Sequence, residues 1–149
     1  MKNILVPVDF SPVTLAVMKQ AEAMARCVDG KLWVIHVAAP DPDFVGLDIG
    51  PKHVRDWRAA QLREEHRGIQ TMALELEERG LDVTPMLVQG PTVELLLNEA
   101  DKLGIDMIIM GSHGHGALYN ALVGTVSEGV LHKAKCPVLI VPSDASAKE

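Results

Sequence analysis

MGSHGHGALYNALVGTVS, residues 110–127, follows an apolar run at 107–110 that is typical of a buried strand. The loop is rich in glycine, which lets backbone N–H groups approach an anion closely. Residues 125–128 fit a capping box with Thr125 as the cap, so a helix should begin there. Because a helix N-terminus carries partial positive charge, this strand, loop and helix predict a phosphate-binding unit of an α/β fold.

Short apolar runs alternate with longer segments of helical periodicity along the rest of the chain. The expected strands are residues 3–8, 31–37, 83–88, 106–110 and 137–141. The expected helices are one that Ser11-Pro12 caps and opens and that ends at Asp29-Gly30, then residues 53–79, 90–103 and 125–134. This alternation predicts an α/β fold with one open, five-stranded parallel sheet and helices on both faces. At 149 residues the chain should form a single domain.

Composition excludes several classes of protein. The net charge is −6 and there is no basic stripe, so the electrostatic signature of a nucleic-acid-binding protein is missing. No stretch approaches the roughly 20 apolar residues that span a bilayer, and the N-terminus does not resemble a signal peptide. We therefore expect a cytoplasmic protein with no nucleic-acid or membrane partner.

Ligands of such folds bind at the carboxyl ends of the strands, where the strand order reverses. This places Pro7-Val8-Asp9, His36-Val37 and the loop from Gly111 on one edge. A dinucleotide-binding unit would carry Gly-x-Gly-x-x-Gly after the first strand, and a P-loop would carry Lys before the hydroxyl residue. The chain has neither pattern, nor the clustered acids and lysine of a receiver domain, so none of these three classes fits it.

The spacing of Gly111, Gly114 and Gly124-Thr125, with nine residues before the last pair, resembles that of universal stress proteins of the ATP-binding subgroup. The stretches ILVPVDFS (4–11), IDMIIMGSHG (105–114) and CPVLIVP (136–142) resemble segments of the same family, as does the Gly90-Pro91 helix start. The resemblance covers the chain apart from residues 39–80. It implies strand order 3-2-1-4-5 and a nucleotide at the junction of the first and fourth strands.

The resemblance also implies roles for individual residues. The adenine and ribose would lie against Pro7, Val8, Asp9, Val37, Met110 and Gly111. The phosphates would lie near His113, Gly114, His115, Gly124, Thr125, Val126 and Ser127, with N–H groups and hydroxyls of the last three as donors. The loop carries no Lys or Arg, and its histidines are mostly neutral at pH 7, so the triphosphate of ATP would depend on the backbone and Mg²⁺. Two histidines alone do not make a metal site, so none is expected from protein side chains.

Three functions remain open at this level. The favoured one is a regulatory, stress-response protein that binds ATP, or ADP or AMP in its place. The alternatives are a slow ATPase that acts as a nucleotide-driven switch, and a dimeric interaction module that binds AMP, cyclic AMP or no nucleotide. No residue is assigned to catalysis, because the loop offers no obvious base. A homodimer is expected through the edge strand Pro137, Val138, Leu139, Ile140 and Val141.

Overall fold

The computed structural model of the chain describes residues 2–40, 52–113 and 123–143. Strands and helices alternate in the order β1 (Asn3–Pro7), α1 (Thr14–Val28), β2 (Lys31–Ala38), α2 (Lys52–Glu78), β3 (Val83–Gln89), α3 (Thr92–Lys102), β4 (Met107–Gly111), α4 (Thr125–Lys133) and β5 (Val138–Val141). Every strand and helix expected from the sequence is present in these ranges, with ends displaced by a few residues.

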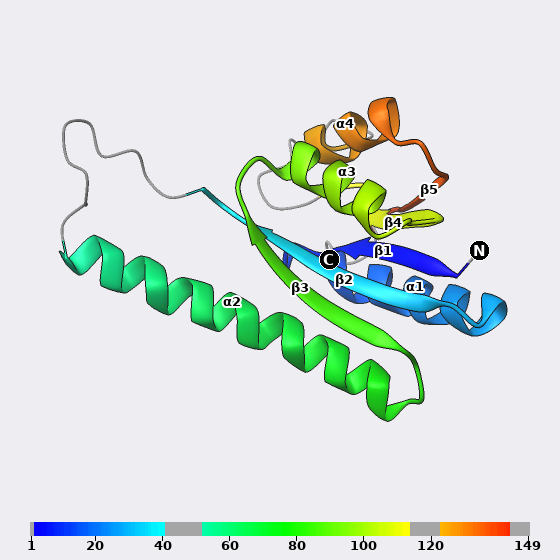
Figure 1. Cartoon of the computed structure of the whole chain (residues 1–149), viewed down its shortest axis with the longest axis horizontal. Coiled ribbons are helices and arrows are strands. Elements are labelled where there is room, and N and C mark those ends of the chain that lie inside the picture. Colours follow the sequence, from blue (N-terminus) through cyan, green and yellow to red (C-terminus); the bar gives the residue numbers. More distant parts are fainter. Residues whose placement is uncertain (1, 41–51, 114–122, 144–149) are drawn as a thin grey trace, which may run out of the picture.

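The five strands form one parallel sheet in the order β3-β2-β1-β4-β5, which confirms the expected topology (Figure 1). Asn3 of β1 pairs with Lys31 of β2, and Ile4 of β1 pairs with Met107 of β4. The first strand therefore lies in the middle of the sheet, and β3 and β5 form its edges.

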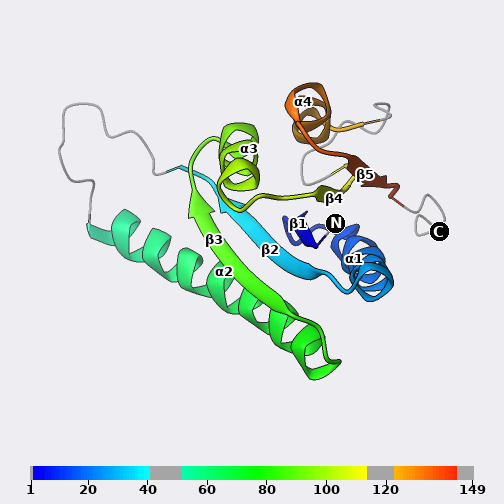
Figure 2. The same cartoon turned by 45° about the vertical axis from the view of Figure 1, so that its right-hand side comes forward.

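Helices cover both faces of the sheet, as the apolar strands predict. Figure 2 shows α1 and α2 on one face and α3 and α4 on the other. The side chains of β1 divide between the two layers: Ile4 and Val6 join the core beneath α1 and α2, whereas Leu5 joins the core beneath α3 and α4. All three are fully buried, because a central parallel strand has no solvent-facing side.

The start of α1 differs from the expectation that Ser11 caps the helix. The N–H of Ser11 is taken by the Asp9 carboxylate at 3.0 Å, and the Ser11 carbonyl accepts the Thr14 N–H at 3.0 Å. The chain therefore passes through a turn first, and Val13 occupies the N-cap without a side-chain hydrogen bond. An Asx turn competes successfully with the serine cap at this position.

The longest helix, α2, has 27 residues, and it contacts the sheet mainly through its C-terminal half, where Ile69, Ala73 and Leu76 are buried. Polar and charged side chains occupy most of its remaining surface. Within the described ranges, no helix is both long enough and apolar enough to cross a membrane.

Asp106 joins the beginning of β1 to the beginning of β4. Its Oδ2 accepts the backbone N–H groups of Lys2 and Asn3 at 2.8 and 2.9 Å, and its own N–H donates to the Asn3 carbonyl at 2.8 Å. The N–H groups of Asn3 and Lys2 hold the pKa of the Asp106 carboxyl below its usual value of 3.8. The charged carboxylate thus completes the backbone hydrogen bonding where the central strand begins.

We expect Asp106→Asn to lower the urea midpoint at pH 7. A carboxyl whose pKa is lower in the folded chain adds stability above its unfolded pKa, and that stability is lost as pH falls through the folded value. The difference between wild type and variant should therefore shrink below pH 3.8. Asp101→Asn, at an exposed carboxylate paired with Lys135, is the control. Equal midpoints of wild type and Asp106→Asn at pH 7 would contradict this role.

Candidate functional site

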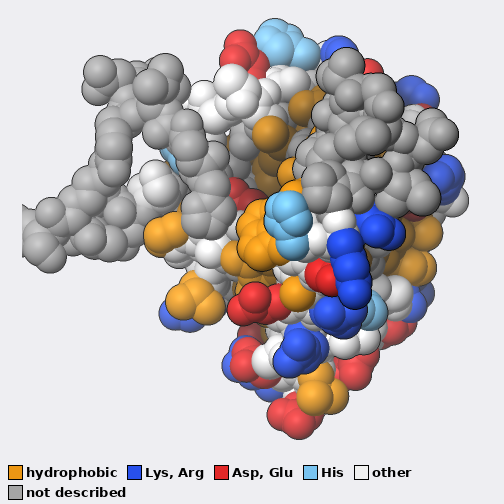
Figure 3. Space-filling view, turned by 90° about the vertical axis from the view of Figure 1, so that its left-hand side faces the viewer, with side chains coloured by type: hydrophobic (Ala, Val, Ile, Leu, Met, Phe, Trp, Pro, Cys, Tyr) orange, Lys and Arg blue, Asp and Glu red, His pale blue; other side chains and the backbone are white. Residues whose placement is uncertain are grey.

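A cavity of about 490 Å³ opens at the carboxyl edge of the sheet, between β1 and β4. The chain continues from these neighbouring strands to opposite faces of the sheet, from β1 to α1 and from β4 to α4. The segments that follow the two strands therefore diverge at this point. Figure 3 looks onto this edge and shows a hollow lined by hydrophobic side chains. The cavity lies where the strand order predicts a ligand.

The structure brings together all of the expected site residues that it describes. Those that line the cavity are Pro7, Val8, Asp9, Val37, Met110, Gly111, His113, Gly124, Thr125, Val126 and Ser127. Gly114 and His115 lie outside the described residues. The described residues of the predicted site therefore share one cavity, and their role in binding a nucleotide stays a prediction.

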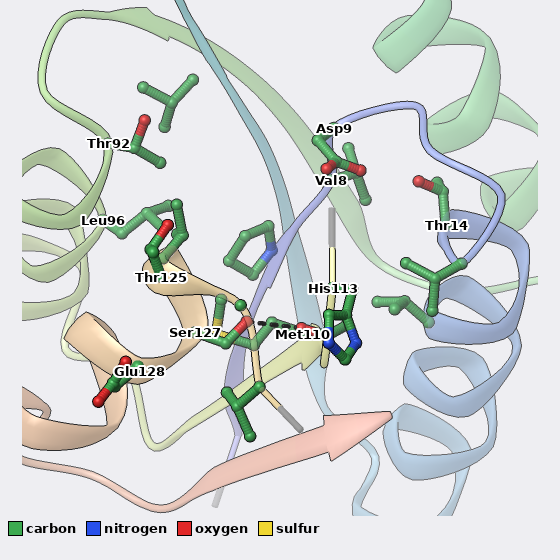
Figure 4. A pocket seen from close by; sticks show the side chains of 18 of the residues that line it. Val8, Asp9, Thr14, Thr92, Leu96, Met110, His113, Thr125, Ser127 and Glu128 are labelled. Atoms are coloured by element: carbon green, nitrogen blue, oxygen red, sulfur yellow. Dashed lines mark hydrogen bonds between the residues drawn. The ribbon is translucent and has the colours of Figure 1, made fainter. Parts of the chain in front are cut away.

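Other lining residues were not expected. They are Val13, Thr14 and Val17 of the α1 segment, Ile35 of β2, Thr92 and Leu96 of α3, Val123 before α4, and Glu128 of α4. The sequence signals were the i, i+3 and i, i+4 spacings of Thr14 with Val17 and of Thr92 with Leu96, next to expected strand ends. Figure 4 shows Thr92 and Thr125 on one side of the cavity and Asp9 and Thr14 on the other.

The cavity combines an apolar wall with backbone donors. Val8, Ile35 and Met110 are buried in the wall, and Leu96 of α3 joins them. A wall of this kind suits an aromatic ring, whose faces are apolar and whose edges form hydrogen bonds.

The backbone donors are at the N-terminus of α4. Gly124 occupies the N-cap, and the first helical hydrogen bond runs from the Glu128 N–H to the Gly124 carbonyl at 2.9 Å. The N–H groups of Thr125, Val126 and Ser127 therefore have no acceptor within the helix. Together with the helix dipole, they form a suitable site for an anion.

The expected capping box is wrong. Thr125 is the first helical residue and not the cap, and no side chain caps this helix. The Gly124 N–H donates to the Ser112 carbonyl at 2.6 Å, which holds the glycine at the helix entry. The Glu128 carboxylate lies 3.7 Å from Nε2 of His132 on the exposed surface, so it does not reach back to the helix start.

Ser127 fixes α4 to the end of β4. Its Oγ donates to the Gly111 carbonyl at 2.7 Å, the dashed line in Figure 4. A hydroxyl has one proton, and here the fold uses it. Ser127 can offer a ligand its backbone N–H, but in this arrangement its hydroxyl does not donate to a phosphate.

Asp9 is held at the opposite side of the cavity by the loop that follows β1. The Val8 N–H donates to the Ile35 carbonyl at 2.9 Å, and one Asp9 oxygen accepts the Ser11 N–H. Phe10 follows with a φ of 59°, a left-handed backbone that is costly for a side chain of this size. Asp9 therefore belongs to a constrained turn, which orients its carboxylate.

Packing against Val13 explains why residue 111 is a glycine, and the sequence did not indicate this contact. A Cβ on Gly111 would lie 2.6 Å from Cγ1 of Val13, which is too close for any side chain. At Gly124 a Cβ would lie 3.2 Å from the Ser112 carbonyl oxygen. The absence of side chains at these glycines thus serves the approach of neighbouring protein groups, whether or not a ligand binds.

His113 is oriented by a short chain of hydrogen bonds. The Ser143 N–H donates to Ser112 Oγ at 3.0 Å, and Ser112 Oγ lies 3.0 Å from Nδ1 of His113. The hydroxyl can then donate its one proton to Nδ1, which leaves the ring proton of a neutral His113 on Nε2. Ser112 therefore fixes the orientation of the His113 imidazole beside the cavity.

The described lining contains two carboxylates, Asp9 and Glu128, and no Lys or Arg. Groups of three or more potential metal ligands are also missing from the ranges that the structure describes. Positive potential in this part of the cavity comes from the backbone N–H groups of α4.

Comparisons with known proteins agree with this geometry. The sequence model of the universal stress protein family matches residues 1–142. Universal stress protein MJ0531 of Methanocaldococcus jannaschii is 32% identical over 94% of this chain and 81% of its own length, and MJ0577 of the same organism is 32% identical over 94% of each chain. The solved structure of MJ0577 superposes with a TM-score of 0.85 over 97% of each chain, at 29% identity. A universal stress protein of Archaeoglobus fulgidus in complex with dAMP shares the fold, with a TM-score of 0.63 and 17% identity over 94% of this chain and 97% of its own.

We expect Gly111→Ala to destabilise the fold by about 1–3 kcal/mol, because the added methyl group overlaps Val13. Val13→Ala removes both Cγ atoms and should make room for it. In urea denaturation, the double variant should be more stable than the sum of the two single losses predicts, by roughly 1 kcal/mol. Strict additivity of the two substitutions would show that this contact does not explain the glycine.

Proposed function

The chain belongs to the universal stress protein family, and we propose that it binds an adenine nucleotide in the cavity between β1 and β4. The observation that carries this proposal is the combination of an apolar wall, the Asp9 carboxylate and the N–H groups of Thr125, Val126 and Ser127 in one cavity. A nucleotide has three parts with matching chemistry, namely an aromatic base, a sugar with hydroxyl groups and an anionic phosphate.

The proposed orientation follows from these three parts. The base lies against Val8 and Val37, and the ribose hydroxyls donate to Asp9. The phosphates reach the N-terminus of α4 beyond Gly124, where the backbone donors and the helix dipole meet them. Met110 and Gly111 line the path between the sugar and the phosphates, and the sequence adds Gly114 and His115 to the phosphate side.

Charge favours ATP only with a cation. The described lining carries two acidic side chains and no Lys or Arg, so each additional phosphate adds negative charge that only dipoles oppose. Mg²⁺ bound to the phosphates would offset it. We therefore propose Mg²⁺-ATP as the cellular ligand, with AMP or ADP able to occupy the same cavity.

The role that best suits this site is a cytoplasmic, regulatory one in a stress response. Hydrolysis of ATP requires a base that positions water and a group that stabilises charge at the terminal phosphate. One oxygen of Asp9 already accepts the Ser11 N–H, and Figure 4 shows Glu128 on the opposite side of the cavity from Asp9. Neither carboxylate is placed as a base, so we propose binding without appreciable turnover.

We also propose a homodimer through β5. The Ile108 N–H donates to the Pro137 carbonyl, and the Ser112 N–H donates to the Val141 carbonyl. Alternation along the strand turns the N–H and C=O groups of Val138 and Ile140 to the open edge of the sheet. An exposed edge strand with unpaired backbone groups can pair with the same strand of a second copy.

Isothermal titration calorimetry tests the nucleotide site, with ATP and AMP each measured with Mg²⁺ and with a chelator. Wild type should bind both nucleotides, with ATP and AMP within about threefold of each other in chelator and ATP favoured when Mg²⁺ is present. Gly124→Val should abolish binding, because a branched side chain would stand at the helix entry that the phosphate approaches.

The control for this substitution is Ala59→Val, which adds similar bulk on the exposed side of α2. Melting temperatures without nucleotide show whether Gly124→Val is still folded. Retained affinity in a folded Gly124→Val variant would refute the proposed site. A strong preference for ATP in chelator would refute the argument from charge.

Sedimentation velocity tests the dimer. Ile140→Pro removes an outward N–H that β4 does not use, and proline is tolerated on edge strands for this reason. The variant should sediment as a monomer at about 10 μM, a concentration at which a standard-sized interface holds dimers together. Ile140→Val, which keeps the N–H, should remain dimeric. A monomeric wild type at this concentration would exclude the proposed assembly.

A further inference from the structure

We propose that His36 and Glu65 form a proton-dependent clamp that positions the loop after β1, so that nucleotide binding weakens as pH rises. Neither residue lines the cavity, and both would act through Val8 and Phe10 on either side of Asp9. The effect on nucleotide affinity rests on the proposed function, whereas the clamp itself does not.

The position of one proton on His36 follows from its contacts. The ring is buried, with 8% of the residue exposed, and Nδ1 lies 2.8 Å from the carbonyl oxygen of Val8. A carbonyl oxygen only accepts hydrogen bonds, so Nδ1 must carry a proton. If His36 is neutral, Nε2 is then left with a lone pair and no hydrogen.

The second nitrogen faces a carboxylate. Nε2 lies 3.5 Å from Oε2 of Glu65, which α2 brings over β2. This oxygen is buried and has no hydrogen-bond partner among the described residues. With a neutral His36 and a charged Glu65, two acceptors would face each other away from water, which is unfavourable. One additional proton turns the contact into an attractive pair, with an imidazolium between the carboxylate and the Val8 carbonyl.

The protonation state of His36 affects the loop after β1 through two contacts. His36 holds the Val8 carbonyl, and its ring centroid lies 4.7 Å from that of Phe10. Phe10 has a left-handed backbone, which the surrounding structure must stabilise. Its ring packs against Gly68 of α2, where an added Cβ would lie 3.0 Å from Cε1 of Phe10. Asp9, the proposed ribose ligand, lies between these two anchored residues.

The nearest basic side chain before Glu65 on its own face of α2 has partners elsewhere. Arg58, seven residues before Glu65 on α2, donates to the Ala39 carbonyl and to Oε1 of Gln61. β3 places Leu87 opposite His36 in the sheet, so that strand contributes no charge at this position. Among the described residues, Asp9 adds a carboxylate one residue beyond the bonded carbonyl of Val8.

The test measures the affinity for AMP by calorimetry from about pH 6 to about pH 9 in wild type, Glu65→Gln and Glu64→Gln. In Glu65→Gln the new side-chain amide can donate to Nε2 of a neutral His36, so the contact no longer requires the additional proton. Wild type should lose about fivefold in affinity relative to Glu65→Gln across this range, the net strength expected of one hydrogen bond. The ratio of the wild-type affinity to the Glu65→Gln affinity at each pH removes the effect of AMP's own titration, which is the same for both proteins. Glu64→Gln, an exposed neighbour, should behave as wild type.

A second measurement keeps the clamp testable without nucleotide. In NMR spectra of the free protein, the ring nitrogens of His36 report where its protons are. We expect a proton on Nδ1 at every pH in this range, and amide shifts of residues 8–11 that follow the titration of His36 in wild type but not in Glu65→Gln.

The outcomes separate the two ideas. If no variant binds AMP, the proposed function fails, and the nitrogen and amide shifts still decide whether the clamp exists. The clamp is overturned if neutral His36 carries its proton on Nε2, or if Glu65→Gln and wild type show the same dependence on pH. If Glu65→Gln does not fold, the proton positions in wild type decide alone.

Discussion

The chain leaves β1 and β4 toward opposite faces of the sheet, and the rest of the structure depends on this constraint. The two strands pair side by side in parallel, but their following segments leave toward different layers of helices. The space between those segments cannot be closed by the sheet itself, because the strands end there. A cavity with a strand end on either side is the geometric result.

Ser112 shows how few contacts are needed to shape that opening. Its N–H donates to Val141 of β5, its carbonyl accepts the Gly124 N–H, and its hydroxyl meets Ser143 and His113. One buried serine therefore connects the edge strand, the entry to α4 and a side chain of the cavity. Among the described residues, this end of the cavity is held in place by hydrogen bonds of the backbone and of one hydroxyl group.

Strand positions and most of the cavity were predictable from the sequence, because buried parallel strands are continuous apolar runs and their carboxyl ends share one edge. The strand order followed only from the resemblance to the universal stress protein family. The two helix starts were not predicted correctly. A residue suited to capping was present at Ser11 and at Thr125. However, the Asp9 carboxylate accepts the Ser11 N–H and the Ser112 carbonyl accepts the Gly124 N–H, and the observed N-caps lie one or two residues away from the expected ones. Thr14 and Thr92 were missed because the rotation of a helix about its axis is set by packing. The packing of Gly111 on Val13 joins residues that are far apart in the sequence, so no local pattern indicates it.

At the N-terminus of α4, the groups that could bind an anion are N–H groups of the main chain. Lysine or arginine in their place would be open to acetylation or methylation, which change charge or hydrogen bonding. Main-chain N–H groups take no such modification, and they cannot be lost through a change of side chain other than to proline. They exist as a set, however, only while the first turn of the helix is formed. An anion held there would therefore report on the local order of α4, and fraying of a single turn would release it.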